Sequence, residues 1–199
     1  MGCLKKIFQS ILLALAIIGF LSIGGKDWVV NIFDKYLHTS HETMMQKAQK
    51  VGDFSNINEE FELEKATGMM GYNGVVAEHK ATGQKMVVID ANNKPLLTRD
   101  DIISGNIEPK LQSVLGKIKY QAIGIENFSV TKHGEMSSFE KVVPYVRFKA
   151  KISRFPVGEV GGVIAVAKNK DGEDRILISA NEDSKYSQLL AEEFFKKIK

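Results

Sequence analysis

The sequence predicts an α+β fold, with an antiparallel sheet packed on helices and an N-terminal hydrophobic helix in front of it. Three observations predict this. Strand-like segments come in pairs joined by short turns, helical segments lie outside those pairs, and the first 25 residues contain a long uncharged run. Strands joined directly by hairpins pair antiparallel, whereas a parallel sheet needs a crossover between single strands.

The uncharged run is Ile7–Gly25, which is 19 residues long. At about 1.5 Å per residue, it forms a helix about as long as the bilayer core is thick. We therefore expect a signal-anchor helix that contacts the lipid bilayer in a single pass. Lys5 and Lys6 precede it, which favours a cytoplasmic N-terminus and a C-terminal domain outside the cell membrane. The alternative is a secreted protein whose signal peptide is cleaved near Gly24.

The chain divides into three parts: the signal-anchor helix at 1–25, a stalk or packing region with helices and a loop at 26–58, and an extracytoplasmic α+β domain at 59–199. In Lys26–Val51, apolar residues recur at steps of three and four, which predicts a membrane-proximal helical segment broken near Thr39. This segment is where we expect a homo-oligomer to form, if the chain forms one. Lipidation of Cys3 is left open.

Sequence patterns in the first half of the domain predict three strands. Glu60–Thr67 alternates apolar and acidic residues, as an edge strand does. Gly74–Lys80 and Gln84–Asp90 follow, joined by the short hairpin loop Ala81–Gly83. Two helices come next, the first capped by Thr98 and the second carrying a proline in its first turn.

The second half predicts four strands and a final helix. Ile123–Lys132 and Tyr145–Phe155 are separated by a polar loop, and Gly161–Ala167 and Asp174–Ser179 form a hairpin. A curved antiparallel sheet wrapped on its helices, in the manner of cystatin-like folds, is the arrangement we expect. The chain ends in an amphipathic helix, Asp183–Lys199, with a predicted buried stripe of Leu189, Leu190, Phe194, Phe195 and Ile198.

The cleanest alternation lies in Tyr145–Phe155, where one face carries Val146, Phe148, Ala150 and Ile152. The other face carries the basic stripe Arg147, Lys149 and Lys151, with Arg154 close by, at intervals of about 7 Å. Such a stripe suits an acidic protein or an anionic envelope component. The competing interpretation is a solvated outer face, balanced by neighbours such as Glu126 and Lys132 across the hairpin.

The composition of the chain excludes several classes of partner and of functional site. The chain has 27 basic and 24 acidic residues, so we expect no nucleic-acid partner. Cys3 is its only cysteine, so the domain has no disulfide and no cysteine nucleophile or metal ligand. A small, lysine-rich, cysteine-poor chain is typical of bacteria.

No motif points to catalysis. His38 and His41 lack the H-E-x-x-H order of zinc enzymes, and Gly158–Gly162 lacks the G-K-[ST] ending of a phosphate loop. We expect those glycines to form a turn or bulge before a buried strand. No serine lies in a G-x-S-x-G elbow. We therefore predict no catalytic residue, cofactor or metal.

The sequence leads us to expect a non-catalytic, membrane-anchored binding or interaction domain. Two alternatives stand beside it. One is a secreted or tethered hydrolase whose site is assembled from distant residues, with His79 or His133 beside a serine or an acid. The other is a structural component of a cell-envelope assembly.

Overall fold

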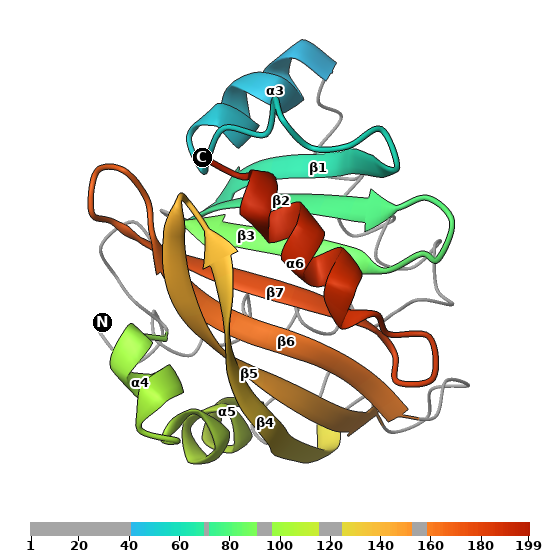
Figure 1. Ribbon diagram of the computed structural model, residues 1–199, viewed down its shortest axis with the longest axis vertical. Coiled ribbons are helices and arrows are strands. Elements are labelled where there is room, and N and C mark those ends of the chain that lie inside the picture. The colour runs from blue at the N-terminus through green and yellow to red at the C-terminus, as the bar shows by residue number, and fades with distance from the viewer. Residues whose placement is uncertain (1–40, 70–71, 91–96, 116–124, 153–158) are drawn as a thin grey trace.

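The computed structural model describes residues 41–69, 72–90, 97–115, 125–152 and 159–199. Its seven strands are β1 (Phe61–Met69), β2 (Tyr72–His79), β3 (Lys85–Asp90), β4 (Ile125–Ser138), β5 (Lys141–Ile152), β6 (Glu159–Lys168) and β7 (Asp174–Glu182). They form one antiparallel sheet in the order β1-β2-β3-β7-β6-β5-β4 (Figure 1). The predicted α+β class, with its antiparallel sheet, is confirmed.

Four helices accompany the sheet: α3 (His41–Gln49), α4 (Arg99–Ile103), α5 (Ile107–Leu115) and α6 (Gln188–Lys197). Figure 1 shows α6 lying across one face, α3 beyond β1, and α4 with α5 at the opposite end. The predicted signal-anchor helix Ile7–Gly25 lies outside the described residues. Among those residues, no helix is both long enough and apolar enough to cross a bilayer.

The strands β6 and β7 occupy the middle of the sheet and are buried on both faces. Their sequences are accordingly apolar almost throughout, as the segment Gly161–Ala167 predicted. The sheet is completed where β7 pairs with β3, for example Leu177 with Val88. This pairing joins the first three strands to the last four.

The core on the α6 side is built from the helix and one face of the strands. Ala191, Phe194, Phe195 and Ile198 are buried there, and they recur at steps of three and four. The predicted stripe was wrong at Leu189, which is 75% exposed. Leu189 lies two positions before Ala191, about 200° around the helix axis, and therefore points away from the sheet.

The other face of the sheet is buried as well. Val146, Phe148 and Ala150 on β5 are almost fully covered, as their alternation predicted. Phe148 stacks on Phe128 of β4 with ring centroids 5.3 Å apart. The short helices α4 and α5 contact this part of the sheet. Thr98 begins α4 with a capping box that includes Asp101, also as predicted.

The hairpin between β4 and β5 corrects the sequence prediction. A polar loop was expected there, but both strands continue to a two-residue turn at Phe139 and Glu140. These residues have φ values of 48° and 59°. Such turns usually contain glycine or asparagine, so the sequence carried no turn signal. The Phe139 ring is buried beside Gly52 and Ile198, which holds the turn in place.

The edge strand β4 is protected by α5. Glu108 accepts a hydrogen bond from the Val130 amide at 3.0 Å, and Gln112 donates one to the Phe128 carbonyl at 3.0 Å. These backbone groups would otherwise be free to pair with another chain. Side chains of α5 therefore close this stretch of the edge.

Candidate functional site

Buried polar side chains hold the start of α6 against the sheet. The Gln84 amide nitrogen donates to the Ser179 hydroxyl at 2.9 Å and to the Ser187 carbonyl at 2.8 Å. The Gln84 amide oxygen accepts from the Ser187 backbone N–H at 2.8 Å. Gln84 and Ser179 are fully buried. Because each partner is satisfied, this network fixes the segment 183–187 between β7 and α6.

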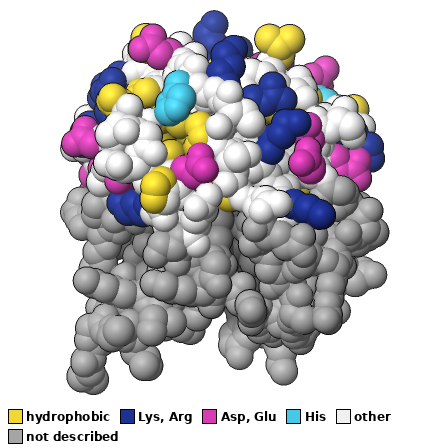
Figure 2. Space-filling model, turned by 90° about the horizontal axis from the view of Figure 1, so that it is seen from below, with side chains coloured by type: hydrophobic (Ala, Val, Ile, Leu, Met, Phe, Trp, Pro, Cys, Tyr) yellow, Lys and Arg dark blue, Asp and Glu magenta, His cyan; other side chains and the backbone are white. Residues whose placement is uncertain are grey.

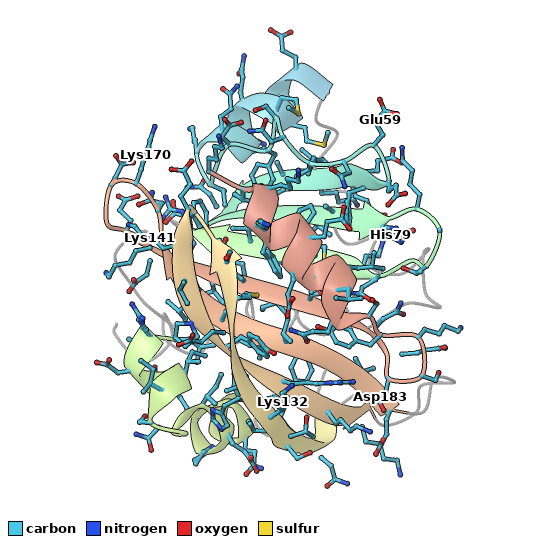
Figure 3. The ribbon with its side chains drawn as sticks, viewed as in Figure 1. Glu59, His79, Lys132, Lys141, Lys170 and Asp183 are labelled. Atoms are coloured by element: carbon cyan, nitrogen blue, oxygen red, sulfur yellow. The ribbon has the colours of Figure 1, made fainter. Side chains whose placement is uncertain are left out.

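Two cations of the predicted basic stripe meet this segment. Lys149 Nζ lies 2.6 Å from Asp183 Oδ2, and Arg147 NH2 lies 3.8 Å from Asp183 Oδ1. Lys149 also lies 3.7 Å from Glu159. The hydrogen bond to Asp183 raises the pKa of Lys149, so the lysine is charged at neutral pH. Figure 3 shows Asp183 at the end of the sheet where α6 begins.

Gly161 makes room for the Asp183 carboxylate. In β6 this glycine pairs with Lys149 on one side and Asn181 on the other. A Cβ atom placed on Gly161 would lie 2.4 Å from Asp183 Oδ1. The carboxylate therefore occupies a slot that exists only because β6 has no side chain there. Of the glycines expected to form a turn or bulge, Gly158 lies outside the described residues, and the expectation was wrong for Gly161 and Gly162, which pair in regular register within β6.

Tyr186 covers the site from the side of α6. Its ring centroid lies 5.3 Å from the Arg147 guanidinium carbon, within the range of a cation–π contact. Burial raises the pKa of the Tyr186 phenol well above its ordinary value, although the nearby arginine lowers it. The phenol is therefore neutral, and it donates a hydrogen bond to Gln188 at 3.3 Å.

The cluster of Arg147, Lys149, Asp183, Tyr186 and Gly161 is called here the Arg147–Asp183 site. Its contacts are incomplete. Arg147 Nε and Asp183 Oδ1 are both buried, and neither has a hydrogen-bond partner. Buried polar atoms are nearly always hydrogen-bonded, so two such atoms without a hydrogen bond in one cluster are unusual. The arginine and lysine side chains are 35% and 38% exposed, so solvent reaches the site.

The structure places the rest of the basic stripe as follows. Lys151 is exposed near the end of β5, and Arg154 lies outside the described residues. The face predicted to be wet is partly covered, because α6 packs on its lower-numbered end at Val143 and Tyr145. Figure 2 shows basic and acidic side chains intermixed over the described surface at this end. The stripe is therefore not a broad cationic face.

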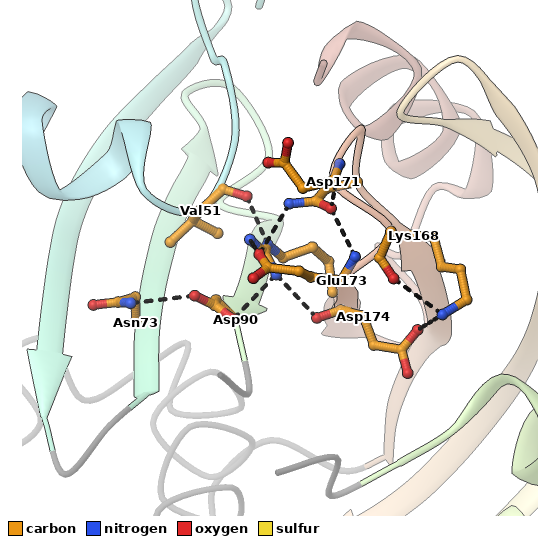
Figure 4. Close-up of polar contacts among 10 residues, drawn as sticks. Val51, Asn73, Asp90, Lys168, Asp171, Glu173 and Asp174 are labelled. Carbon is orange, nitrogen blue, oxygen red and sulfur yellow. Dashed lines mark hydrogen bonds and ion pairs between the residues drawn. The ribbon is translucent and has the colours of Figure 1, made fainter. Parts of the chain in front are cut away.

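A second polar cluster lies at the opposite end of β7 (Figure 4). Arg175 is 2% exposed and its guanidinium contacts Asp90 at 3.0 Å, Glu173 at 2.8 Å and the Val51 carbonyl at 2.9 Å. Asn73 completes the shell with a bond to Asp90 at 3.2 Å. Each cationic nitrogen has an acceptor, so this cluster joins three parts of the fold and is structural.

The candidate histidines lie apart from the Arg147–Asp183 site. His79 Nδ1 is 2.9 Å from the Thr82 hydroxyl, and its Nε2 is 3.7 Å from Glu60. The Thr82 hydroxyl also accepts from the Gln84 backbone, so these contacts close the β2–β3 hairpin. His133 is exposed on β4, and His38 lies outside the described residues. Within the described part of the chain, no three His, Cys, Asp or Glu side chains group as a metal site.

Sequence reasoning found Arg147 and Lys149 but missed Asp183, Tyr186 and the role of Gly161. Asp183 and Tyr186 are separated from β5 in the sequence by the two strands β6 and β7, and their proximity to β5 depends on the order of β5, β6 and β7 in the sheet. The glycine pair was the one local signal, since glycine inside an apolar strand often marks a close approach. Compared with known proteins, the chain matches no family model, and no curated protein matches it significantly.

Proposed function

We propose that this chain is a membrane-tethered, non-catalytic binding domain that uses the Arg147–Asp183 site to hold an anionic group of a partner outside the cell membrane. The observation that carries the proposal is the pair Arg147 and Lys149, placed together on β5 beside the Asp183 carboxylate, whose buried Oδ1 atom accepts no hydrogen bond. Cations that are solvent-accessible and incompletely paired are suited to bind an external anion.

The tether is the second part of the proposal. It rests on the uncharged length of Ile7–Gly25 and on Lys5 and Lys6 before it. In this arrangement the described domain stands outside the membrane behind the segment 26–58. Secretion after cleavage near Gly24 is the alternative, and it would leave the same binding site on a diffusible protein.

Two finer features of the architecture belong to the same proposal. The wrapping of a curved sheet around α6 supports a cystatin-like arrangement. Self-association through the membrane-proximal helix is proposed for the part of Lys26–Val51 that precedes α3. Within its own chain α3 contacts β1, so it already has a packing partner.

Capture of an envelope component tests the binding role. The full-length tagged chain is solubilised in mild detergent, immobilised and exposed to solubilised envelope material at low salt. We expect wild type to retain an anionic component that the double variant Arg147→Gln, Lys149→Gln does not retain. Lys168→Gln, Lys185→Gln is the matched control, because it removes two other ion-paired cations. Equal retention by the two double variants would contradict the proposal.

A further inference from the structure

We propose that the Asp183 carboxylate is an internal occupant of an oxyanion site, and that a carboxylate or phosphate group of the partner displaces it. The inference rests on the proposed function, because it names the chemistry of the group that the Arg147–Asp183 site takes. The site is the slot over Gly161 together with the cations of Arg147 and Lys149. Asp183 then acts as a built-in competitor that lowers the affinity for weak anions.

The shape of the slot supports this assignment. The carboxylate lies directly over the Gly161 Cα, in space that any side chain at that position would fill. Lys149 on the neighbouring strand lies beside it at 2.6 Å. The slot thus already holds an oxyanion, supplied by the chain itself.

The contacts in the slot are worse than an external oxyanion could make. Arg147 approaches Asp183 Oδ1 only to 3.8 Å, which is longer than a hydrogen bond, and its Nε is unpaired. A guanidinium prefers two parallel hydrogen bonds to one carboxylate or phosphate. The Asp183 side chain is short and fixed to the loop, so it does not reach this geometry. A free group is not tethered to the loop, and the Arg147 side chain is 35% exposed to it.

Displacement needs only a side-chain rotation. The Asp183 backbone amide donates to the Glu159 carbonyl at 2.9 Å, which keeps the loop paired to the sheet. The Asp183 side chain is 22% exposed although its Oδ1 atom is buried, so a rotation of the side chain would bring this oxygen to water. Changing the rotamer of a partly exposed side chain is fast and leaves the backbone in place.

The surroundings limit the ligand to one oxyanion group. Glu159 lies 3.7 Å from Lys149 on the outer side, and its side chain is 58% exposed. Charges of both signs are intermixed on this end of the molecule (Figure 2). A polyanion would meet these acids, whereas a single carboxylate or phosphate group would meet mainly Arg147 and Lys149.

The test uses the full-length chain in detergent micelles, titrated with inorganic phosphate and, separately, with acetate. The readout is the NMR resonance of the Arg147 Nε–H group, which reports contact at the site itself. We expect saturable binding by wild type. Replacing Asp183→Asn removes a charge within about 4 Å and should tighten binding at least about fivefold. Arg147→Gln and Lys149→Gln should each weaken binding. Because Arg147→Gln lacks the Nε–H group, binding to this variant is followed by the resonance of the Asp183 backbone amide.

Asp174→Asn is the matched control. It removes the carboxylate of the first residue of β7, which is ion-paired with Lys168 at 3.1 Å, and its Oδ1 is likewise buried without a hydrogen-bond partner. We expect it to leave phosphate and acetate binding unchanged. The proposal is overturned if Asp183→Asn binds no more tightly than wild type, or if Asp174→Asn gives the same gain.

Two further experiments identify the source of the oxyanion and distinguish failure of the binding site from failure of the membrane tether. In nanodiscs, a shift of the Arg147 resonance only when phosphatidic acid is included identifies a lipid headgroup, whereas a shift only with added phosphate identifies a soluble ligand. Failure of both anions to bind would overturn the site while leaving the membrane tether standing. Conversely, a cleaved and soluble mature chain that still binds phosphate would remove the tether and support the site.

Discussion

At the scale of single residues, Arg175 shows how strongly this fold depends on one buried charge. Its guanidinium lies among Asp90, Glu173 and the Val51 carbonyl, and it is 2% exposed. Removing one member of a buried ion pair costs more than the pair contributes, because the remaining charge stays desolvated. Without Arg175, the Asp90 carboxylate would stay buried and would lose the guanidinium that it contacts.

We therefore predict that Arg175→Met destabilises the protein by about 3–5 kcal/mol. The measurement is urea unfolding of the full-length chain in mild detergent. Lys168→Met is the control, because its ion pair with Asp174 involves a lysine that is 53% exposed and should contribute about 0–1 kcal/mol. Equal losses for the two variants would show that Arg175 is not a structural centre.

The basic stripe of β5 and its partner Asp183 show what residue patterns predict and what they do not. Strict alternation is a local property, so Arg147 and Lys149 could be assigned to one face from the sequence alone. Asp183 could not be assigned to them. It reaches β5 only because β6 lies between the two strands and carries glycine at the facing position. The periodicity of residues within one strand does not predict a site that depends on the order of the strands in the sheet.

At the scale of elements, the turn at Phe139 and Glu140 has a strained backbone and is held by packing against distant parts of the chain. Both residues have positive φ, a conformation that costs a non-glycine residue about 1–2 kcal/mol. Phe139 is buried in the α6-side core, whereas Glu140 is exposed. The strain at Glu140 therefore has no compensating burial.

Replacing Glu140→Gly should accordingly stabilise the protein by about 1 kcal/mol and raise its melting temperature by a few degrees. The exposed ion pair of Glu140 with Lys199, 3.7 Å apart, contributes little. Glu135→Gly is the control in the exposed middle of β4, where φ is ordinary and glycine should lower stability. Calorimetry that shows both variants losing stability would argue against strain at the turn.

The capping box of α4 makes a pH-dependent contribution to the stability of the folded protein. Although burial raises the pKa of Asp101, hydrogen bonds from Lys110 and Thr98 outweigh it, so the pKa is lower in the folded state. The stabilisation is therefore present above the unfolded value of about 3.9 and is lost as the pH falls through the folded value. We predict that Asp101→Asn flattens the acid limb of stability measured between about pH 5 and pH 2. An unchanged acid limb would contradict this.

Elements with local signals were the predictable ones. The α4 cap and the glycine turns at Gly83 and Gly172 follow from short-range chemistry, and both glycines have positive φ. The tight turn of the β4–β5 hairpin was missed because its residues are held by distant contacts with Gly52 and Ile198. The start of α6 was placed five residues early, because residues 183–187 are held by Gln84, just before β3, and by Glu159 of β6.

At the scale of the whole molecule, the sheet closes by pairing β7 with β3, although many residues separate them in the sequence. Hairpin signals predicted an antiparallel sheet but gave no order for its two halves. The order matters for the proposed site, because it brings β5, β6 and the loop after β7 together at the start of α6. We propose one domain with a binding end, held at a membrane by the segment in front of it.

The most direct test of that account is the size and location of the mature chain. Cells expressing it with a C-terminal tag are fractionated, the membranes are washed at alkaline pH, and intact cells or spheroplasts are treated with protease. The account predicts a full-length product that resists the wash and loses its tag to external protease. A tag protected from protease, or a soluble product shortened to a start near Gly25, would contradict the tethered, outward-facing domain.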